Sequence, residues 1–418
     1  MISQDLLGWF ALLFIISGTF LISKKNPNTK NFLLLAVFVR SILVILDQYL
    51  ITLPDSTGDA VIFEKKAFLY SEEYGLGVIK NMTQLDSFFI SKFISIFYTI
   101  FERSPMLAKM LSVGFGTGAV FLIYKLCFII WGHRVALKAG WVAAIFPSFI
   151  LYSSLILREV YVIFFLTYAL IGCVNFISKN NLNSLVRATF GFLIASLFHG
   201  PIILGYLIFL AYVCLRVLIQ NNFFLRFKKT NLKLIFFLPI LVLPILAYFL
   251  GYYSIPKIGN FKNFDSFKSK KNITINSFEE KIIWTINKAT RSSGENNNGA
   301  SYPNWTIPKD LKELIFLVPV RMFYLLYAPF PWDVKKAKHI IGLLDAFLYF
   351  CLTYYIYLNR KNLFNNPQTR FLILIFFFYI MVYSCGVGNF GTGLRHRLKF
   401  ISLAIILAGQ KLPRFKIF

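Results

Sequence analysis

The chain has 418 residues, of which 57% are hydrophobic, 18% aromatic and only 15% charged, and its formal net charge is +26. Soluble domains carry roughly 25% charged residues, so this sequence has too little polar surface for the soluble domains that its length would otherwise form. Its composition excludes a soluble protein and predicts one that crosses a bilayer. The spans must be helices, because lipid offers the backbone no hydrogen-bond partner.

The large positive charge does not indicate nucleic-acid binding. The 44 Lys and Arg residues lie between the apolar runs and do not gather on one soluble face. Membrane proteins place such residues in cytoplasmic loops that face anionic headgroups. We therefore expect membrane lipids as partners and no nucleic acid, with only a few of these cations left for a lipid phosphate or an anionic sugar.

Apolar runs of spanning length recur along residues 1–253, since a bilayer core of about 30 Å needs about 20 helical residues. We interpret the first run as a span and not as a cleaved signal, because a basic region and a small-residue cleavage site are missing from it. The sequence His199-Gly200-Pro201 divides a long run into two short spans. The predicted spans are Leu6–Ile22, Phe32–Leu53, Met106–Trp131, a fourth that ends near Tyr152, Val160–Phe176, the two within Leu182–Ile219, and Leu234–Tyr252.

Two hydrophilic stretches interrupt these runs. Residues 54–105 mix aromatic and polar side chains, as helices on a membrane surface do. Residues 254–312 are rich in Asn, Lys and Ser and predict an outer loop or a small subdomain. We therefore divide the chain into an N-terminal transmembrane module (1–253) with an outer loop at 54–105, the insert 254–312, and a C-terminal transmembrane module (313–418).

The C-terminal module leaves one topological question open. Leu314–Phe330 either spans the bilayer or lies re-entrant at its outer surface, and it is followed by predicted spans at Ile340–Leu358, Phe371–Gly386 and about Leu398–Leu412. The positive-inside rule does not decide, because both topologies place equally many basic residues inside. The fold class is an all-α polytopic helix bundle of about 11 or 12 transmembrane helices, expected in a bacterial inner (plasma) membrane.

Two polar clusters follow the outer ends of early spans. The first is Asp55–Ala60 together with Glu64, where a carboxylate could act as a general base on a hydroxyl. Alternatively, Asp59 could cap the helix that follows. The second cluster ends in Arg158-Glu159, where the planar guanidinium of Arg158 suits a phosphate. The alternative there is a headgroup anchor or an Arg–Glu pair in solvent.

Two more clusters lie later in the chain. His199 stands at a turn, where a lone histidine is more often structural than functional. Residues 386–397 contain a Gly-x-Gly-x-x-Gly spacing, but no strand–turn–helix unit surrounds it, so we discard a dinucleotide site. A glycine-rich break at a membrane exit is tolerated where backbone lines a cavity. The adjoining Arg395-His396-Arg397 suits a phosphate leaving group, or alternatively anchors the last span at the cytoplasmic face.

Ionisable residues also lie within or at the edge of the apolar runs. Such residues are functional candidates by default, because a charge in the membrane is costly. They are Asp47, Arg321 and Asp345. Asp47 could instead pair with Arg40, which lies two helical turns before it.

The order of these features resembles the GT-C class of membrane glycosyltransferases, the superfamily that includes protein O-mannosyltransferases and aminoarabinose transferases. The resemblance covers roughly residues 55–215 and, more weakly, 314–410. Four elements carry it: Gly58-Asp59-Ala60 with Phe63-Glu64 and Ala67, residues 116–134, residues 146–159, and Arg395–Phe400. Their order along the chain is more telling than any one of them alone.

The resemblance implies that a sugar passes from a polyprenyl-phosphate donor to an extracytoplasmic glycan, lipid or protein, as in cell-envelope polysaccharide biosynthesis. Asp59, in the outer loop 54–105, matches the family's catalytic base or metal contact. Arg158 and Arg395 match its phosphate-binding residues. The remaining candidates for substrate binding are Asp55, Glu64, Glu159, His199, Arg321, His396 and Arg397.

The cofactor and two other functions are left open. The five cysteines have no metal or redox spacing, so the sequence identifies no cofactor with certainty, and the metal ligands are unknown. A divalent cation remains open through the resemblance alone. The alternative functions are a polymerase of polysaccharide repeat units and a transporter or flippase of lipid-linked sugars, although no internal repeat of the transporter kind is evident.

Overall fold

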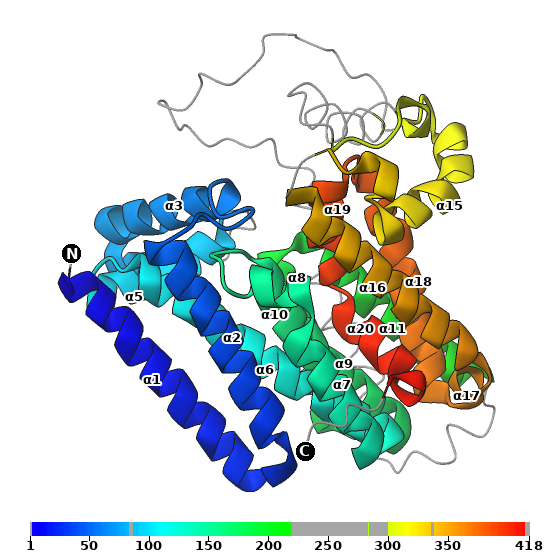
Figure 1. Cartoon of the computed structure of the whole chain (residues 1–418). Helices are drawn as coiled ribbons and strands as arrows, with labels where there is room; N and C mark the ends of the chain where they lie inside the picture. The colour runs from blue at the N-terminus through cyan, green and yellow to red at the C-terminus, as the bar shows by residue number, and fades with distance from the viewer. Residues whose placement is uncertain (1, 83–86, 220–282, 284–299, 336–337, 414–418) are drawn as a thin grey trace. The chain divides into compact units, whose positions relative to one another are not determined.

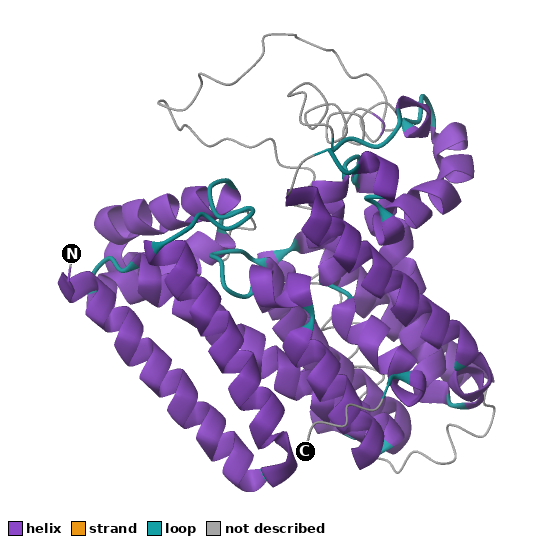
Figure 2. Ribbon diagram, viewed as in Figure 1, coloured by secondary structure: helices purple, strands orange, loops and turns teal. Residues whose placement is uncertain are grey.

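The computed structural model describes residues 2–82, 87–219, 283, 300–335 and 338–413, and within these ranges it contains helices and no strand (Figure 2). One isolated bridge joins Ser301 to Asn389. The predicted span Leu234–Tyr252 and most of the predicted insert 254–312 lie outside the described residues. Residues 1–209 and 283–418 form one compact unit, to which the contacts below belong. Of residues 210–282, the structure describes only the last part of α11 (Ile203–Ile219).

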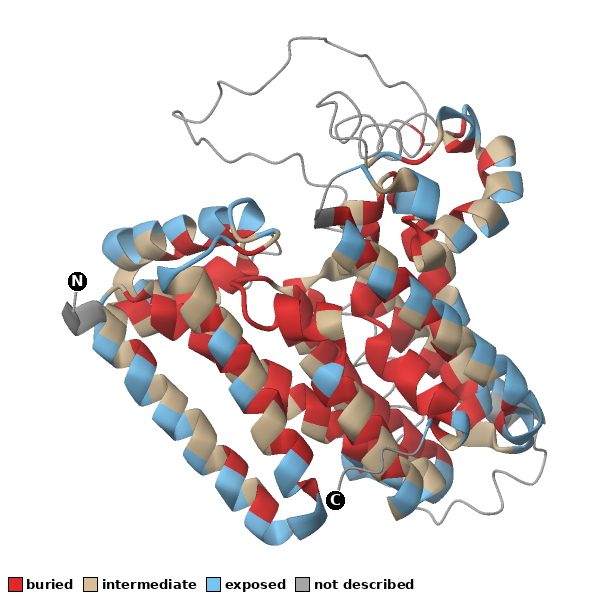
Figure 3. Ribbon diagram, in the orientation of Figure 1, coloured by how far each residue is buried: buried red, intermediate tan, exposed pale blue. Residues whose placement is uncertain are grey.

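Six helices among the described residues are long and apolar enough to cross a bilayer, which supports an integral membrane protein of the all-α class. They are α1 (Ile2–Lys25), α2 (Lys30–Tyr49), α6 (Pro105–Trp131), α9 (Glu159–Lys179), α16 (Lys338–Leu358) and α18 (Pro367–Gly386). Figure 3 shows how unequally they are buried: 78% of the spanning window of α9 is buried, but only 17% of that of α1. α9 is therefore the central helix, and α1 is peripheral.

The stretch after α2 forms short helices, as its mixed composition predicts. The principal ones are α3 (Asp59–Tyr74) and α5 (Phe89–Phe101), with α4 (Val78–Asn81) between them. Ser91 Oγ of α5 donates to the carbonyl of Phe63 in α3 at 2.8 Å, which fixes the two helices against each other. α6 then begins at Pro105, and Ser104 caps it by accepting a hydrogen bond from the N–H of Leu107 at 3.1 Å.

Two of the predicted spans are broken helices. The fourth consists of α7 (His133–Ile145) and α8 (Pro147–Tyr152), and the last, predicted at about Leu398–Leu412, begins at the break between α19 (Phe390–Leu398) and α20 (Ile401–Ala408). Pro147 explains the first break, because proline lacks an N–H and disfavours a helical conformation in the residue before it. Phe146 is accordingly extended, with φ −66° and ψ 117°. The second break falls at Lys399 and Phe400, which are both buried.

The two helices predicted within residues 182–219 are present as α10 (Leu182–Phe198) and α11, divided at His199 as expected. α10 packs tightly on α9 through small residues. A Cβ at Gly172 would lie 2.5 Å from the nitrogen of Ala188, and one at Gly191 would lie 2.7 Å from the nitrogen of Ala169. Only glycine permits this approach, which is how small residues join helices in membranes.

Helix termini gather at each of the two ends of this compact unit. At one end, Trp131 at the close of α6 donates to the carbonyl of Ile406 in α20 at 2.9 Å, and Asn359 after α16 donates to that of Leu407 at 3.0 Å. We call this the opposite end. At the other, which we call the α3 end, α2 and α8 finish and α3, α6 and α9 begin. Lys109 of α6 there lies 2.8 Å from Asp47 of α2.

α15 (Leu311–Tyr327) begins and returns at the α3 end, which answers the open topological question (Figure 1). Before α15, the N–H of Tyr302 donates to the carbonyl of Gly388, just past α18, at 2.9 Å. After α15, the ring of His339 lies 5.0 Å from that of Phe390, the first residue of α19. Both flanks of α15 therefore contact the same helix terminus, so the predicted segment Leu314–Phe330 is re-entrant and does not cross.

Three fully buried arginines bind the carbonyls of broken or terminated helices. Arg40 donates to the carbonyls of Ala143 and Ala144, at the end of α7, at 3.4 and 3.1 Å. Arg321 donates to four carbonyls, three of which lie at the end of α18; the four belong to Thr306, Ser384, Cys385 and Val387, at 2.6–3.0 Å. Arg397 donates to Leu326 and Ala328, at the end of α15, at 2.9 and 2.7 Å. Each guanidinium thus replaces the water that a helix end would bind in solution.

The suggested pairing of Asp47 with Arg40 is wrong. Two helical turns place these residues about 10 Å apart along the axis. Asp47 pairs instead with Lys109 and accepts a hydrogen bond from the N–H of Leu53 at 2.9 Å. Arg40 turns to α7 and to the hydroxyl of Ser153, whose Oγ lies 2.7 Å from its Nε.

The re-entrant α15 predicts a definite sidedness, which single cysteines in a cysteine-free background can report. Thr57→Cys, Lys312→Cys and Thr392→Cys should all react with a membrane-impermeant maleimide added to one side of the membrane. Lys361→Cys, after α16, should react only from the other side. Labelling of Thr392→Cys from the same side as Lys361→Cys would contradict the fold.

The pair formed by Arg397 and Asp345 predicts strong coupling. Nη2 of Arg397 lies 2.6 Å from Oδ2 of Asp345, and both side chains are at most 1% exposed. Arg397→Met leaves a buried carboxylate without its cation, which costs about 3–5 kcal/mol in comparable sites. The double variant Arg397→Met/Asp345→Leu should recover part of that loss, because no unpaired charge remains.

Thermal unfolding in detergent measures this coupling, with the exposed Arg360→Met as the matched control. A double variant no more stable than the sum of its two single changes would show that the two charges are uncoupled.

Candidate functional site

The α3 end of the unit collects polar side chains from segments far apart in the sequence. Each stands at or next to a helix terminus, so the ends of the helices position them. They are Asp55 and Asp59 before and in the first turn of α3, Tyr152 at the end of α8, Arg158 and Glu159 at the start of α9, His199 after α10, Tyr383 near the end of α18, and Arg395, His396 and Lys399 in and after α19.

A bridge of opposite charges forms the centre of this cluster. Nη1 of Arg395 lies 2.6 Å from Oδ2 of Asp59, and its Nε lies 3.4 Å from Oε1 of Glu159. Burial acts to lower the pKa of Arg395, but Glu159 and Asp59 outweigh it and raise that pKa above its ordinary value. Arg395 is therefore a permanent cation that joins α3, α9 and α19.

The two carboxylates of this bridge differ in their contact with water. The side chain of Glu159 is only 2% exposed, whereas that of Asp59 is 47% exposed. Asp59 does not cap α3: Gly58 occupies the N-cap position, and the Asp59 carboxylate turns to Arg395. The structure therefore sets aside the capping interpretation and leaves Asp59 open to a molecule in solution.

Two histidines lie beside the bridge. Nδ1 of His199 is 2.7 Å from the hydroxyl of Tyr383, and the ring of His199 is 5.4 Å from that of His396. Removal from water lowers the pKa of both imidazoles well below its usual range, and the nearby cations Lys399, Arg158 and Arg395 lower it further. Both rings are thus neutral at neutral pH, and either can donate or accept a hydrogen bond.

Lys399 lies beneath the bridge, in the turn between α19 and α20. Its side chain is fully buried, and Nζ is 3.6 Å from Oε1 of Glu159 and 3.4 Å from Nδ1 of His396. Lys399 therefore contacts both Glu159 and His396 from within the protein interior.

Three buried polar atoms of the cluster have no hydrogen-bond partner among the described residues. They are Nε of Arg158, Nε of Arg395 and Oε2 of Glu159. A buried polar atom without a partner costs free energy, so neighbouring unpaired donor and acceptor groups are suited to a ligand that carries both oxygens and hydroxyls. The cations at this end, Arg158, Arg395 and Lys399, favour an anionic one.

The remaining predicted residues have separate partners. Asp55 adopts a left-handed conformation with φ 64° and accepts a hydrogen bond from the hydroxyl of Tyr152 at 2.8 Å, which ties the loop before α3 to the end of α8. Glu64 lies away from the bridge: Arg103 holds both its oxygens at 2.8–2.9 Å, and Tyr98 donates to it at 3.2 Å. Glu64 therefore joins α3 to the segment after α5.

Two further predicted residues do not reach the cluster. All the hydrogen bonds of Arg321 go to backbone carbonyls. Arg397, although only two residues from Arg395, points to Asp345 and to the end of α15, because residues two apart on a helix face nearly opposite sides. The structure gives both arginines a supporting role, and neither side chain is free to bind a substrate.

Sequence reasoning missed three members of the cluster: Tyr152, Tyr383 and Lys399. The tyrosines stand in apolar runs, where nothing in the pattern separates them from core aromatics. Lys399 belongs to the segment Arg395–Phe400, one of the four elements of the family resemblance. In the sequence, however, it is only one of several charged residues at the start of a predicted span. A lysine within the predicted last span, about Leu398–Leu412, was the available signal.

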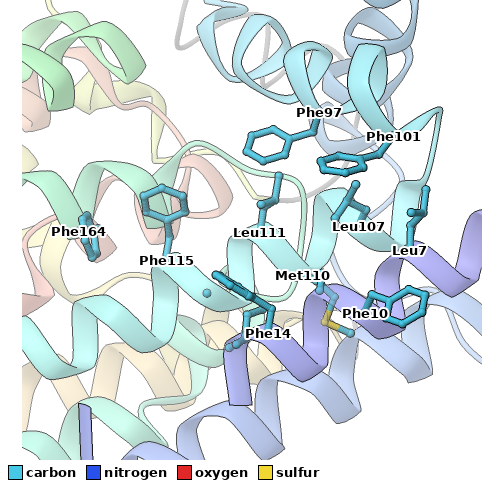
Figure 4. A pocket seen from close by; sticks show the side chains of 13 residues that line it. Leu7, Phe10, Phe14, Phe97, Phe101, Leu107, Met110, Leu111, Phe115 and Phe164 are labelled. Carbon is cyan, nitrogen blue, oxygen red and sulfur yellow. The ribbon is translucent and has the colours of Figure 1, made fainter. Parts of the chain in front are cut away.

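An apolar groove of about 590 Å³ lies near the cluster, between α1, α5, α6 and α9 (Figure 4). Its walls are almost entirely hydrocarbon and aromatic, as Figure 4 shows; they include Phe10, Phe14, Phe97, Phe101, Phe115 and Phe164. The ring of Phe115 in one wall is 4.7 Å from that of Tyr161 in α9, and Tyr161 stacks at 4.9 Å on Phe198 at the end of α10, so ring contacts join the groove to the helices that carry Glu159 and His199.

No group of three or more His, Cys, Asp or Glu side chains within the described ranges is placed to hold a metal ion. The carboxylates of the cluster face cations instead: Asp59 and Glu159 share Arg395. A divalent cation does not fit this donor set, since a nearby guanidinium would repel it.

No protein-family model matches the chain, and no curated protein or solved structure is significantly similar to it. The resemblance to GT-C glycosyltransferases therefore depends on the residues of this sequence, and its functional content is a proposal.

Proposed function

We propose that this protein is a membrane glycosyltransferase, of the plasma membrane of a bacterium, that transfers a sugar from a polyprenyl-phosphate donor to an extracytoplasmic glycan, lipid or protein. One observation carries the proposal: Asp59, Arg395 and Glu159, from three distant segments, meet at one end of the bundle. An exposed carboxylate beside buried cations is the combination that sugar transfer from a phosphate requires.

The cations suit the phosphate. When the bond between the sugar and the phosphate breaks, the phosphate oxygen takes the electron pair and gains negative charge. Groups that stabilise this charge accelerate the step. Arg395 and the unpartnered Nε of Arg158 supply hydrogen-bond donors, and the amine of Lys399 lies in the same neighbourhood. Buried positions strengthen their effect, because water does not screen them.

Asp59 suits the acceptor. A general base must lie within hydrogen-bond reach of the proton that it removes, and Asp59 is the exposed carboxylate of the bridge. In the proposed reaction, Asp59 takes the proton of an acceptor hydroxyl while the hydroxyl oxygen attacks the anomeric carbon. The products are the glycosylated acceptor and polyprenyl phosphate, so atoms and charges balance.

The apolar groove suits the hydrocarbon tail of such a donor. Its lining is almost wholly apolar, and it runs along spanning helices α1 and α6. Phe115, in its wall, leads through Tyr161 and Phe198 to the residues next to Glu159 and His199. A prenyl chain in this groove would place its phosphate toward the cluster and leave the sugar at the α3 end.

The proposal predicts that Asp59→Asn abolishes transfer while the protein remains folded. Loss of a general base costs about 10²–10⁴-fold in rate, and an amide cannot accept the proton. Glu72→Gln changes an exposed acid on the same helix and should keep wild-type activity. The assay follows radiolabelled sugar from a panel of polyprenyl-phosphate sugars into glycan, lipid or protein in proteoliposomes.

Each outcome of this assay assigns a function. Full activity of Asp59→Asn would remove Asp59 from the mechanism. Long repeating products would indicate a repeat-unit polymerase, and movement of the donor across the bilayer without a new glycosidic bond would indicate a flippase.

A further inference from the structure

We propose that binding of the donor phosphate displaces Asp59 from Arg395, so that the base is released only when the donor is in place. This inference rests on the proposed function and adds a gate to the same site. It follows from the way that one guanidinium is shared between two unequal carboxylates.

The first step of the argument concerns the ion pair that the Asp59 carboxylate forms with Arg395. Its Oδ2 lies 2.6 Å from Nη1 of Arg395, so one oxygen of this exposed carboxylate is already paired with a cation. The same guanidinium is the strongest candidate for the phosphate. A phosphate that approaches Nη1 meets the Asp59 carboxylate already paired there. The two anions repel each other, so phosphate and Asp59 compete for Arg395.

The second step is the asymmetry of the bridge. Glu159 is buried and is also 3.6 Å from Lys399, so it stays in place. Asp59 is 47% exposed and stands in the first turn of α3, so water can solvate it when it leaves. An anion that enters the bridge therefore replaces Asp59 and not Glu159, and Glu159 holds Arg395 in position throughout.

The third step is the advantage of a phosphate over a carboxylate. Asp59 reaches only Arg395 among the described cations of the cluster, whereas a phosphate has oxygens enough to contact Arg395 and Arg158 at once. Nε of Arg158 has no hydrogen-bond partner among the described residues, and Lys399 lies fully buried close by. The phosphate gains hydrogen bonds that Asp59 cannot make.

The exchange also orders the later steps. Once Asp59 has taken the acceptor proton it is neutral, so it no longer competes for Arg395 while the phosphate leaves the sugar. When Asp59 gives that proton to water, its charge returns, and it again competes with the departing polyprenyl phosphate. The same carboxylate would then act first as the base and afterwards as the group that expels the product.

Competition has a signature that no simple contact would give: removing Asp59 should tighten phosphate binding. The probe is farnesyl monophosphate, titrated into the purified full-length protein in detergent by calorimetry. Asp59→Asn and Asp59→Ala should each bind it about fivefold more tightly than the wild type, because a half-exposed ion pair contributes about 1 kcal/mol. Arg395→Gln should bind it at least about tenfold more weakly, and Glu72→Gln should match the wild type.

The outcomes separate this inference from the proposed function. Equal or weaker binding by both Asp59 variants, with weaker binding by Arg395→Gln, would overturn the gate and leave the phosphate site standing. Binding that Arg395→Gln does not change, or that farnesol reproduces, would overturn the phosphate site itself. Absence of binding by the wild type together with binding by Asp59→Asn would support the gate in its strongest form.

Discussion

The structure depends on how helix ends inside a membrane protein satisfy their carbonyl groups. Lipid offers these carbonyls no donor, and this fold terminates or breaks helices away from bulk water at α7, α15 and α18. One buried arginine serves each of these ends, and the guanidinium suits the task because it presents five donors in a rigid fork. Arg40, Arg321 and Arg397 thereby make an irregular interior possible.

That irregular interior is what brings the site together. A bundle of uninterrupted spans would hold its polar residues in loops, where each could move independently. Here α8 stops at Tyr152 and α9 starts at Glu159, with the connecting residues Ser153–Leu157 all buried. α19 is short and lies beside them. The charges of Asp59, Glu159 and Arg395 consequently meet on fixed helix termini, where geometry is set by packing.

Part of this arrangement could be predicted from the sequence. Composition and the length of the apolar runs indicate a helical membrane protein, and the polar clusters at helix ends include Asp59, Glu159 and Arg395. Hydropathy could not place α15, because a re-entrant helix and a spanning one bury similar side chains. It also could not find the partner of Asp47 or distinguish Arg395 from Arg397, since both depend on contacts between segments from about 50 to more than 300 residues apart.

The short helix α19 has a consequence for how mutational data on this protein should be understood. Arg395 and Arg397 are two residues apart and face opposite sides, one toward the bridge and the other toward the support of α15 and α16. A deep mutational scan with a growth readout would show both positions as equally intolerant of substitution. Because they are neighbours in the sequence, they would be interpreted as one motif. Measuring the amount of folded protein in the membrane separately from growth would show whether Arg397 acts through folding alone and whether Arg395 does not.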